Sequence, residues 1–171
     1  MAIPIEERFE VAAPIEQVWA YFSDPPQVVP CIPGAELVKA VDETTYEGTV
    51  GLQVGPVRAK FRGTVLIESM DADKRTMTLV ARGTQQGAQG RAEAQVQFGL
   101  QSLDEQRTEV MVRADVSIAG KLAQMGGGMI QSVSRQIFRK FAECARSEIL
   151  NEDVGAGDRS QKRKEGGVAA D

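Results

Sequence analysis

Few residues in this chain have the types and spacing that support catalysis or metal binding. The sequence contains no histidine, so it lacks the side chain best suited to acid–base chemistry near neutral pH and the commonest metal ligand. Adjacent carboxylates such as Asp42-Glu43 and Asp104-Glu105 fall where the pattern predicts strand ends or loops. We therefore predict no catalytic residue and no metal site.

The cysteines give no sign of chemistry either. Cys31 and Cys144 are far apart in the sequence and fit no metal-ligand spacing. The chain opens without a basic segment followed by a long apolar stretch, so no secretory signal is expected and a cytoplasmic location follows. Because that compartment keeps thiols reduced, we expect both cysteines to be reduced and partly buried.

Charge and hydropathy exclude two classes of protein. The formal net charge of −4 argues against a nucleic-acid-binding protein, which needs a concentrated basic surface. No apolar run approaches the roughly 20 residues that span a bilayer. A chain of 171 residues is long enough for one domain with a sizeable core.

The clearest functional pattern is a set of small residues where a filled core would carry large ones. Residues 46–54 and 57–65 alternate apolar and polar side chains around Gly55-Pro56, which is typical of a β-hairpin. Across the predicted strands, the small residues in the apolar registers are Gly48, Ala59, Gly63, Ala81, Gly83, Ala92, Ala94 and Ala114. Protein interiors are normally filled, so the pattern indicates either an apolar cavity for a ligand or a closely packed helix.

Larger apolar residues next to these registers are the candidates to line such a cavity. Methionine suits this role because its flexible side chain adapts to irregular apolar guests. The predicted lining consists of Leu52, Phe61, Met77, Leu79, Phe98, Val112, Met125 and Met129. Val28, Ile32 and the glycine-rich loop 83–90 are expected to border its mouth.

The elements that position these residues follow from periodicity. Strands are predicted at 3–11, 36–41, 45–54, 57–67, 76–85, 91–100 and 108–118. Helices are predicted at 14–22, at 27–31 and, as one long amphipathic helix, from 122 to about 150. Gly126-Gly127-Gly128 leaves two interpretations open, a loop before a late-starting helix or a flexible first turn beside the cavity mouth.

This order predicts an α+β fold of the helix-grip type. A curved antiparallel sheet of about six to seven strands would wrap around the long C-terminal helix, with two short helices after the first strand. Residues 1–150 would form the ligand-binding domain, and residues 151–171, which lose the apolar pattern, a disordered polar tail.

Four segments of the chain resemble those of one family. They are residues 11–19, 31–36, 48–65 and 120–126. On these segments the chain resembles the CoxG family of carbon monoxide dehydrogenase subunits, within the START/Bet v 1-like (SRPBCC) superfamily of helix-grip proteins. The resemblance implies a non-catalytic accessory protein that links a molybdenum hydroxylase or carbon monoxide dehydrogenase to the membrane.

The same resemblance implies a ligand and a location. The ligand would be a hydrophobic small molecule, with a quinone held in the cavity, and the protein would work at the inner face of the membrane. Some family members carry a C-terminal membrane anchor, whereas residues 151–171 contain no apolar stretch. Recruitment through the enzyme or through the cavity mouth is therefore expected instead.

Two other functional classes remain open at this point. An enzyme of the cyclase or aromatase type could use the same fold, but it would need a polar group inside the cavity, and Tyr46 is the main candidate. A protein that serves only in interaction with, or assembly of, a metalloenzyme would have a filled interior and no ligand.

Overall fold

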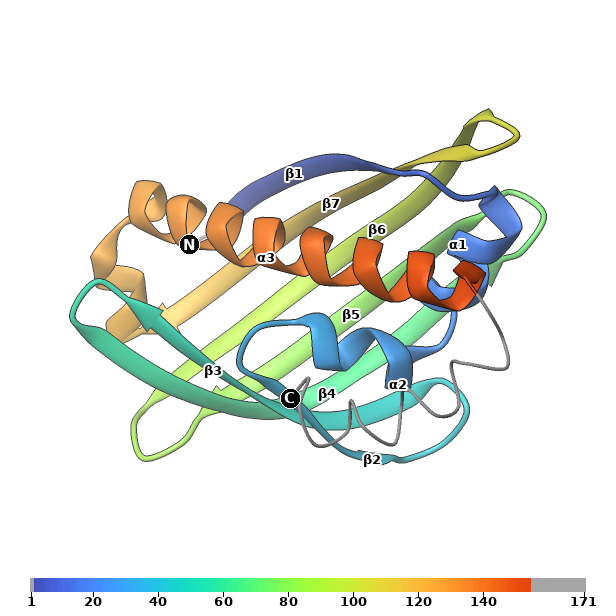
Figure 1. Cartoon of the computed structure of the whole chain (residues 1–171). Helices are drawn as coiled ribbons and strands as arrows, with labels where there is room; N and C mark the ends of the chain where they lie inside the picture. Colours follow the sequence, from blue (N-terminus) through green and yellow to red (C-terminus); the bar gives the residue numbers. More distant parts are fainter. Residues whose placement is uncertain (1, 155–171) are drawn as a thin grey trace.

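The computed structural model describes residues 2–154, and these form one curved antiparallel sheet with helices on its concave face (Figure 1). Seven strands lie in the order β1-β7-β6-β5-β4-β3-β2. The strands are β1 (Ala2–Val11), β2 (Ala35–Ala40), β3 (Thr45–Val54), β4 (Val57–Asp71), β5 (Thr76–Gln85), β6 (Gly90–Asp104) and β7 (Arg107–Gly120). The helices are α1 (Ile15–Phe22), α2 (Pro25–Val28), the 3-10 helices η1 (Val29–Cys31) and η2 (Lys121–Met125), and α3 (Gly127–Val154). The predicted helix-grip fold is confirmed.

Alternation along the strands decides which face of the sheet is buried. In β4, Ala59 and Phe61 are buried, whereas Arg58, Lys60 and Arg62 between and beside them are exposed. Side chains of a strand point alternately to its two faces, so the apolar set of each strand lies beneath α3 and the polar set faces solvent.

The apolar core is divided into two clusters. The first core cluster lies around α1 and the C-terminal half of α3, and its largest members are Phe9, Trp19, Tyr21, Phe22, Met77, Phe98 and Ile149. The second core cluster comprises Ile3, Val54, Ala59, Phe61, Ile118, Leu122 and Ile130. The concave face of the sheet connects the two.

A row of glycines crosses three neighbouring strands between these clusters. Gly48 of β3 pairs with Gly63 of β4, which pairs with Gly83 of β5. A Cβ atom at Gly63 would collide with the backbone at Arg82, and one at Gly48 would lie 2.7 Å from the carbonyl oxygen of Glu36. Glycine permits this approach of adjacent backbones, so the row is a crease where the sheet bends around the helix.

The C-terminal helix differs from the prediction at both ends. It begins at Gly127, after the separate helix η2, because Gly126 has a φ of 88° and ends η2. The first glycine therefore lies between two helices, and the next two form the first turn of α3. The helix ends at Val154, four residues beyond the predicted boundary. The rest of the predicted tail, residues 155–171, lies outside the described residues.

The prediction of reduced cysteines is wrong. Cys31 and Cys144 form a disulfide with a Cα–Cα distance of 5.4 Å. The bond joins η1 to α3, two elements whose separation of 113 residues in the sequence offered no reason to place them together. It fastens the segment between α1 and β2 to the helix that covers the sheet.

Alanine substitutions in this row of glycines should show whether the close approach of the strands, or only the loss of a flexible glycine, changes the free energy of unfolding. We expect Gly63→Ala to lower the free energy of unfolding by about 2 kcal/mol or more, because β5 backbone occupies the space for the new methyl group. Gly83→Ala is the matched control, since the nearest atom to its Cβ would be 3.4 Å away. Equal losses in urea unfolding would contradict the crease.

Removal of the disulfide should destabilise the fold without changing it. We expect Cys31→Ala with Cys144→Ala to lower the free energy of unfolding by about 2–5 kcal/mol, because the bond closes a long loop in the unfolded chain. Urea unfolding monitored by circular dichroism measures this. Free thiols in the denatured, unreduced wild-type protein would show that the bond does not form.

Candidate ligand-binding site

The concave face between the two core clusters is incompletely covered. Val65 of β4, Ala81 of β5 and Ala94 of β6 pair across adjacent strands at the middle of the sheet. None of the three belongs to either cluster. Val65 is 37% exposed although its register points it toward α3. These residues leave an uncovered area on the concave face, which we call the hollow.

Helix α3 covers this hollow. It crosses the concave face of the sheet (Figure 1). Val133 packs against the second core cluster and Phe138 against the first, whereas Ile137 is half-buried and belongs to neither. The helix thus joins both clusters and spans the space between them.

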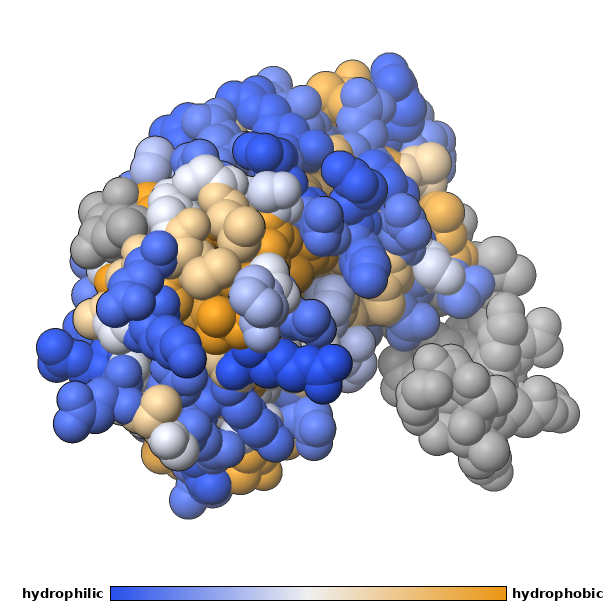
Figure 2. Space-filling view, turned by 90° about the vertical axis from the view of Figure 1, so that its left-hand side faces the viewer, coloured by the Kyte–Doolittle hydropathy of each residue, from blue (hydrophilic) through white to orange (hydrophobic). Residues whose placement is uncertain are grey.

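The hollow is bordered at one end by glycine and methionine. Cβ atoms placed on Gly126, Gly127 and Gly128 would meet no atom within 4 Å. The tips of Met125 and Met129 lie against Gly55 in the β3–β4 turn, at 3.1 and 3.2 Å from its Cβ position. Figure 2, which views this end, shows apolar side chains recessed among polar ones. The β3–β4 hairpin therefore contacts η2 and α3 here through flexible methionine side chains.

The predicted lining residues are divided between the two sides of the hollow. Those in or against the first core cluster are Val28, Met77, Leu79, Phe98 and Val112. Those in or against the second are Leu52, Phe61 and Met125. Met129 is 41% exposed at the end of the molecule, and Ile32 is half-buried after η1. The loop within 83–90 lies at the same end as Met129, where Gly120 contacts Gln89.

Residues nearer the hollow were left out of the predicted lining. Ala81 and Ala94 were recognised only as small residues of the apolar registers. Val65 and Ile137, which carry the register or periodicity of the buried faces, were not singled out. The predicted lining favoured large side chains, whereas large residues pack into the clusters and leave the small ones facing the space between them.

Gln85 is a polar residue of the concave face that the sequence reasoning missed. It shares a face of β5 with Gly83 and pairs with Phe61 of β4. Its side-chain oxygen is buried without a hydrogen-bond partner within residues 2–154. A buried amide of this kind can hydrogen-bond a polar group on an otherwise apolar ligand. Strict alternation from Gly83 would have identified it.

The ionisable groups with displaced pKa values serve turns and surface pairs. The Arg113 guanidinium, followed by that of Arg8, lowers the pKa of Glu6. The backbone N–H of Thr44 lowers the pKa of Asp42 in the β2–β3 turn. Each is a local surface contact outside the concave face.

Three further polar groups also have structural partners. Arg107 lowers the pKa of Asp104, and its own pKa is raised in turn. The hydroxyl of Tyr46 donates to the carbonyl oxygen of Glu43 at 3.4 Å, which directs it to the β2–β3 turn. Within the described chain, no group of acidic, cysteine or histidine side chains could hold a metal ion.

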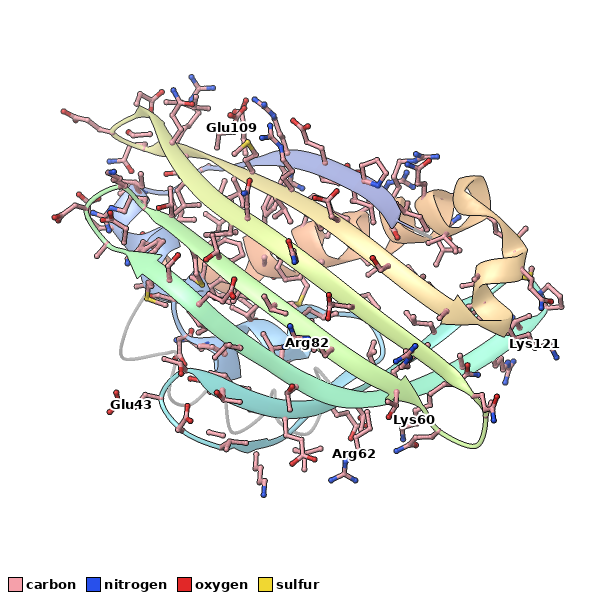
Figure 3. The ribbon with its side chains drawn as sticks, turned by 180° about the vertical axis from the view of Figure 1, so that it is seen from behind. Glu43, Lys60, Arg62, Arg82, Glu109 and Lys121 are labelled. Atoms are coloured by element: carbon pink, nitrogen blue, oxygen red, sulfur yellow. A yellow bond between two sulfur atoms is a disulfide. The ribbon has the colours of Figure 1, made fainter. Side chains whose placement is uncertain are left out.

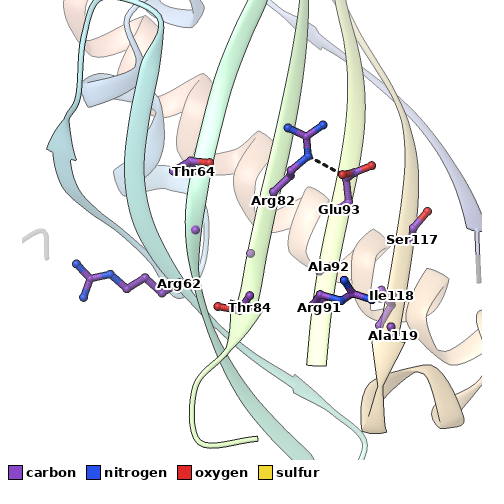
Figure 4. Close-up of a pocket in the computed structure, with 12 residues that line it drawn as sticks. Arg62, Thr64, Arg82, Thr84, Arg91, Ala92, Glu93, Ser117, Ile118 and Ala119 are labelled. Atoms are coloured by element: carbon purple, nitrogen blue, oxygen red, sulfur yellow. Dashed lines mark hydrogen bonds and ion pairs between the residues drawn. The ribbon is translucent and has the colours of Figure 1, made fainter. Parts of the chain in front are cut away.

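A second depression lies on the outer face of the sheet (Figure 4). It is an open groove of about 570 Å³ over β4, β5, β6 and β7. Its polar side chains include Arg62, Arg82, Arg91 and Glu93, and Arg82 is paired with Glu93 at 2.6 Å. The groove is separated from the hollow by the sheet itself, and charged side chains border it.

Solved structures with this architecture belong to the START and Bet v 1-like class. A conserved protein from Geobacillus kaustophilus superposes with a TM-score of 0.79 at 19% identity, covering 88% of this chain and 97% of its own. An aromatase/cyclase from Streptomyces sp. R1128 superposes with a TM-score of 0.64 at 15% identity, covering 92% and 98%. A START superfamily protein from Mycobacterium smegmatis gives 0.58 at 15% identity, covering 86% and 97%. At these identities the likeness establishes the fold alone.

The family is established by sequence. The model of the CoxG family of carbon monoxide dehydrogenase subunits matches residues 8–150. The chain belongs to this family, which is of the accessory type, and the predicted membership is confirmed. No curated protein matches the chain. Between residues 2 and 154, no helix is both long and apolar enough to cross a membrane.

Filling the hollow should be tolerated where filling the core is not. We expect Ala94→Leu to change the free energy of unfolding by less than about 0.5 kcal/mol, because the new side chain enters open space. Ala145→Leu is the control, since Ala145 is 0% exposed in the first core cluster and overpacking costs about 1–3 kcal/mol. Similar losses for both variants in urea unfolding would contradict a hollow.

Proposed function

We propose that this protein binds a hydrophobic small molecule, of the quinone or lipid type, in the hollow beneath α3. The single observation that carries the proposal is the inward-facing but 37% exposed Val65, set among small residues between two separate core clusters. Exposed apolar surface on a concave face is stabilised by an apolar guest, which gains about 25 cal/mol per Å² buried.

The lining also favours a ligand that is mostly apolar with one polar end. The middle of the sheet contributes aliphatic and alanine side chains, and the amide of Gln85 is the buried polar group without a partner in the described structure. A quinone fits the apolar lining through its tail, and its reduced form offers a ring hydroxyl that would donate to the unpartnered Oε1 of Gln85. The amide nitrogen of the same side chain can donate to a ring carbonyl of the oxidised form.

The family membership supports a role as an accessory to a larger enzyme. We infer that the bound molecule is exchanged with a carbon monoxide dehydrogenase or molybdenum hydroxylase-type partner, and that the protein works beside the inner face of the membrane. The protein would then connect the enzyme with the quinone pool and perform no chemistry on its cargo.

Binding in solution tests the proposal directly. We expect a short-chain quinone to bind the wild-type protein in isothermal titration calorimetry, and Ala94→Leu to weaken binding about tenfold or more by occupying the hollow. Ala119→Leu adds the same volume on the exposed outer face and should bind as the wild type does. Gln85→Leu should reduce affinity for the quinone more than for an alkane of equal length.

The outcomes separate the proposed lining from the proposed function. Unchanged binding in Ala94→Leu, Phe61→Trp and Met129→Trp would place the ligand elsewhere. No heat and no thermal shift with any quinone or lipid would contradict ligand binding and favour a protein that acts only through protein–protein interaction.

A cyclase-type enzyme is the alternative that the fold allows, since an aromatase/cyclase is among the similar structures. It would require a polar group positioned for proton transfer. The hydroxyl of Tyr46 donates to the carbonyl of Glu43 and is therefore directed to the β2–β3 turn. The Gln85 amide neither accepts nor releases protons readily. Ligand binding without turnover is therefore the better-supported function.

A further inference from the structure

The segment between α1 and β2 has few attachments to the rest of the protein. We call residues 25–33, which include α2 and η1, the α2–η1 segment. Four of these nine residues are proline, which has no backbone N–H. The backbone hydrogen bonds of the segment all join it to itself or to the adjoining residues 24 and 35. Within residues 2–154, neither a side-chain hydrogen bond nor an ion pair connects it to the sheet or to α3.

Fixed points lie on both sides of the α2–η1 segment. Before it, the hydroxyl of Ser23 donates to a carbonyl of α1 at 2.7 Å. After it, the carbonyl of Gly34 accepts from the backbone N–H of Gly51 in β3 at 2.9 Å. Between these points, Val28 and Cys31 contact the first core cluster. The segment is thus held by apolar contacts and by the disulfide.

The disulfide joins elements that are held at opposite edges of the sheet. Helix α3 is fastened to the edge strand β1, where Gln131 donates to the carbonyl of Pro4 at 3.0 Å and Arg146 to that of Glu10 at 2.8 Å. The α2–η1 segment precedes β2, the other edge strand. Both elements lie on the concave face (Figure 1), and the disulfide connects them across it.

The hollow is bounded by these two elements in front and by the sheet behind. Figure 3, which views the molecule from behind, shows the strands with Arg62 and Arg82 on their outer face. On the concave face, the exposed Val65 pairs with Tyr46 of β3. Tyr46 packs against the first core cluster, as Val28 of the segment does. Movement of the segment away from α3 would therefore widen the opening beside Val65.

The rest of the fold has contacts that do not depend on the disulfide. Besides the bonds from α3 to β1, the side-chain amide of Gln17 in α1 donates to the carbonyl of Ile149 in α3 at 2.8 Å. Cleavage of the disulfide would therefore release the α2–η1 segment and leave α3 in place. The two cysteines also differ in accessibility, since Cys31 is 4% exposed whereas Cys144 is half-buried. A thiol reagent therefore reaches Cys144 first.

We propose that the disulfide between Cys31 and Cys144 is a redox switch that controls access to the hollow. While the bond is intact, the α2–η1 segment is held against α3. When the bond is reduced, the segment moves away and an apolar ligand enters and leaves faster. The inference rests on the proposed function in one respect, because faster exchange requires a ligand in the hollow.

The reductant is a dithiol of the Cys-x-x-Cys type. One of its thiolates attacks the sulfur of Cys144, the disulfide breaks, and Cys31 leaves as a thiolate that takes up a proton. The second thiolate of the reductant then attacks the reductant's own sulfur in the mixed disulfide and releases Cys144, which also takes up a proton. Two electrons and two protons pass to the protein, and the reductant becomes a disulfide.

Hydrogen exchange of the full-length, ligand-free protein tests the release of the segment. We expect reduction with dithiothreitol to speed amide exchange in residues 25–33 about tenfold or more, and in β6 and β7 less than twofold. Cys31→Ala with Cys144→Ala should exchange as the reduced wild type does and should not respond to dithiothreitol. Unchanged exchange in residues 25–33 would overturn the proposal. Loss of the far-ultraviolet circular dichroism on reduction would also overturn it, because the bond would then hold the whole fold.

Thiol labelling measures access to the hollow without a ligand. Ala81→Cys places a thiol at the middle of the concave face, next to Val65. We expect N-ethylmaleimide to label it about fivefold faster or more when Cys31→Ala and Cys144→Ala are added. Ala119→Cys, on the exposed outer face, is the matched control and should react equally fast in both backgrounds. Equal labelling of Ala81→Cys in the two backgrounds would contradict control of access.

Release of a short-chain quinone completes the test. Because thiols reduce quinones, the variant Cys31→Ala with Cys144→Ala represents the reduced state, and it should release the quinone about tenfold faster than the wild type in stopped-flow displacement. Equal release rates would overturn the switch. If neither protein binds a quinone, the proposed function fails, and the hydrogen exchange and labelling results decide the switch by themselves.

Discussion

The close approach of the β5 backbone to Gly63 is the contact on which the shape of the molecule depends. At this point, and at Gly48 against β2, the neighbouring strand occupies the space that a side chain would fill. A sheet bent in this way wraps around α3 (Figure 1). Core clusters form at both ends, and the middle, lined by alanine and valine, remains hollow. The glycines act through curvature, and the alanines provide the space.

The two ends of α3 differ in how they are held on the sheet. Its C-terminal half packs against α1 and is joined to η1 by the disulfide between Cys31 and Cys144. Its first turn contains glycine and contacts the β3–β4 turn through methionine tips. The well-packed half fixes the helix on the sheet, so the half with fewer fixed contacts can border an opening.

The sequence was sufficient for the fold because alternation along seven strands and one long apolar stripe admit few arrangements. It also indicated the hollow, through the small residues in the inward registers. It did not reveal what each of those residues does. Gly63 and Gly48 are glycines because the backbone of a neighbouring strand occupies the space of a side chain, and the sequence pattern does not show that contact. The disulfide was missed for a related reason, since only the folded path brings residues separated by 113 positions together. Gln85 was missed because the large apolar side chains, which pack into the clusters, dominate the pattern along the strands.

The most direct test of a ligand-binding hollow is mass spectrometry of an organic-solvent extract of the protein purified gently from its native host. A quinone or lipid recovered at about one molecule per chain is the expected result. It should be absent from the Ala94→Leu protein purified in the same way, in which the hollow is filled. An empty extract from the wild-type protein, or equal recovery from both, would contradict the central claim.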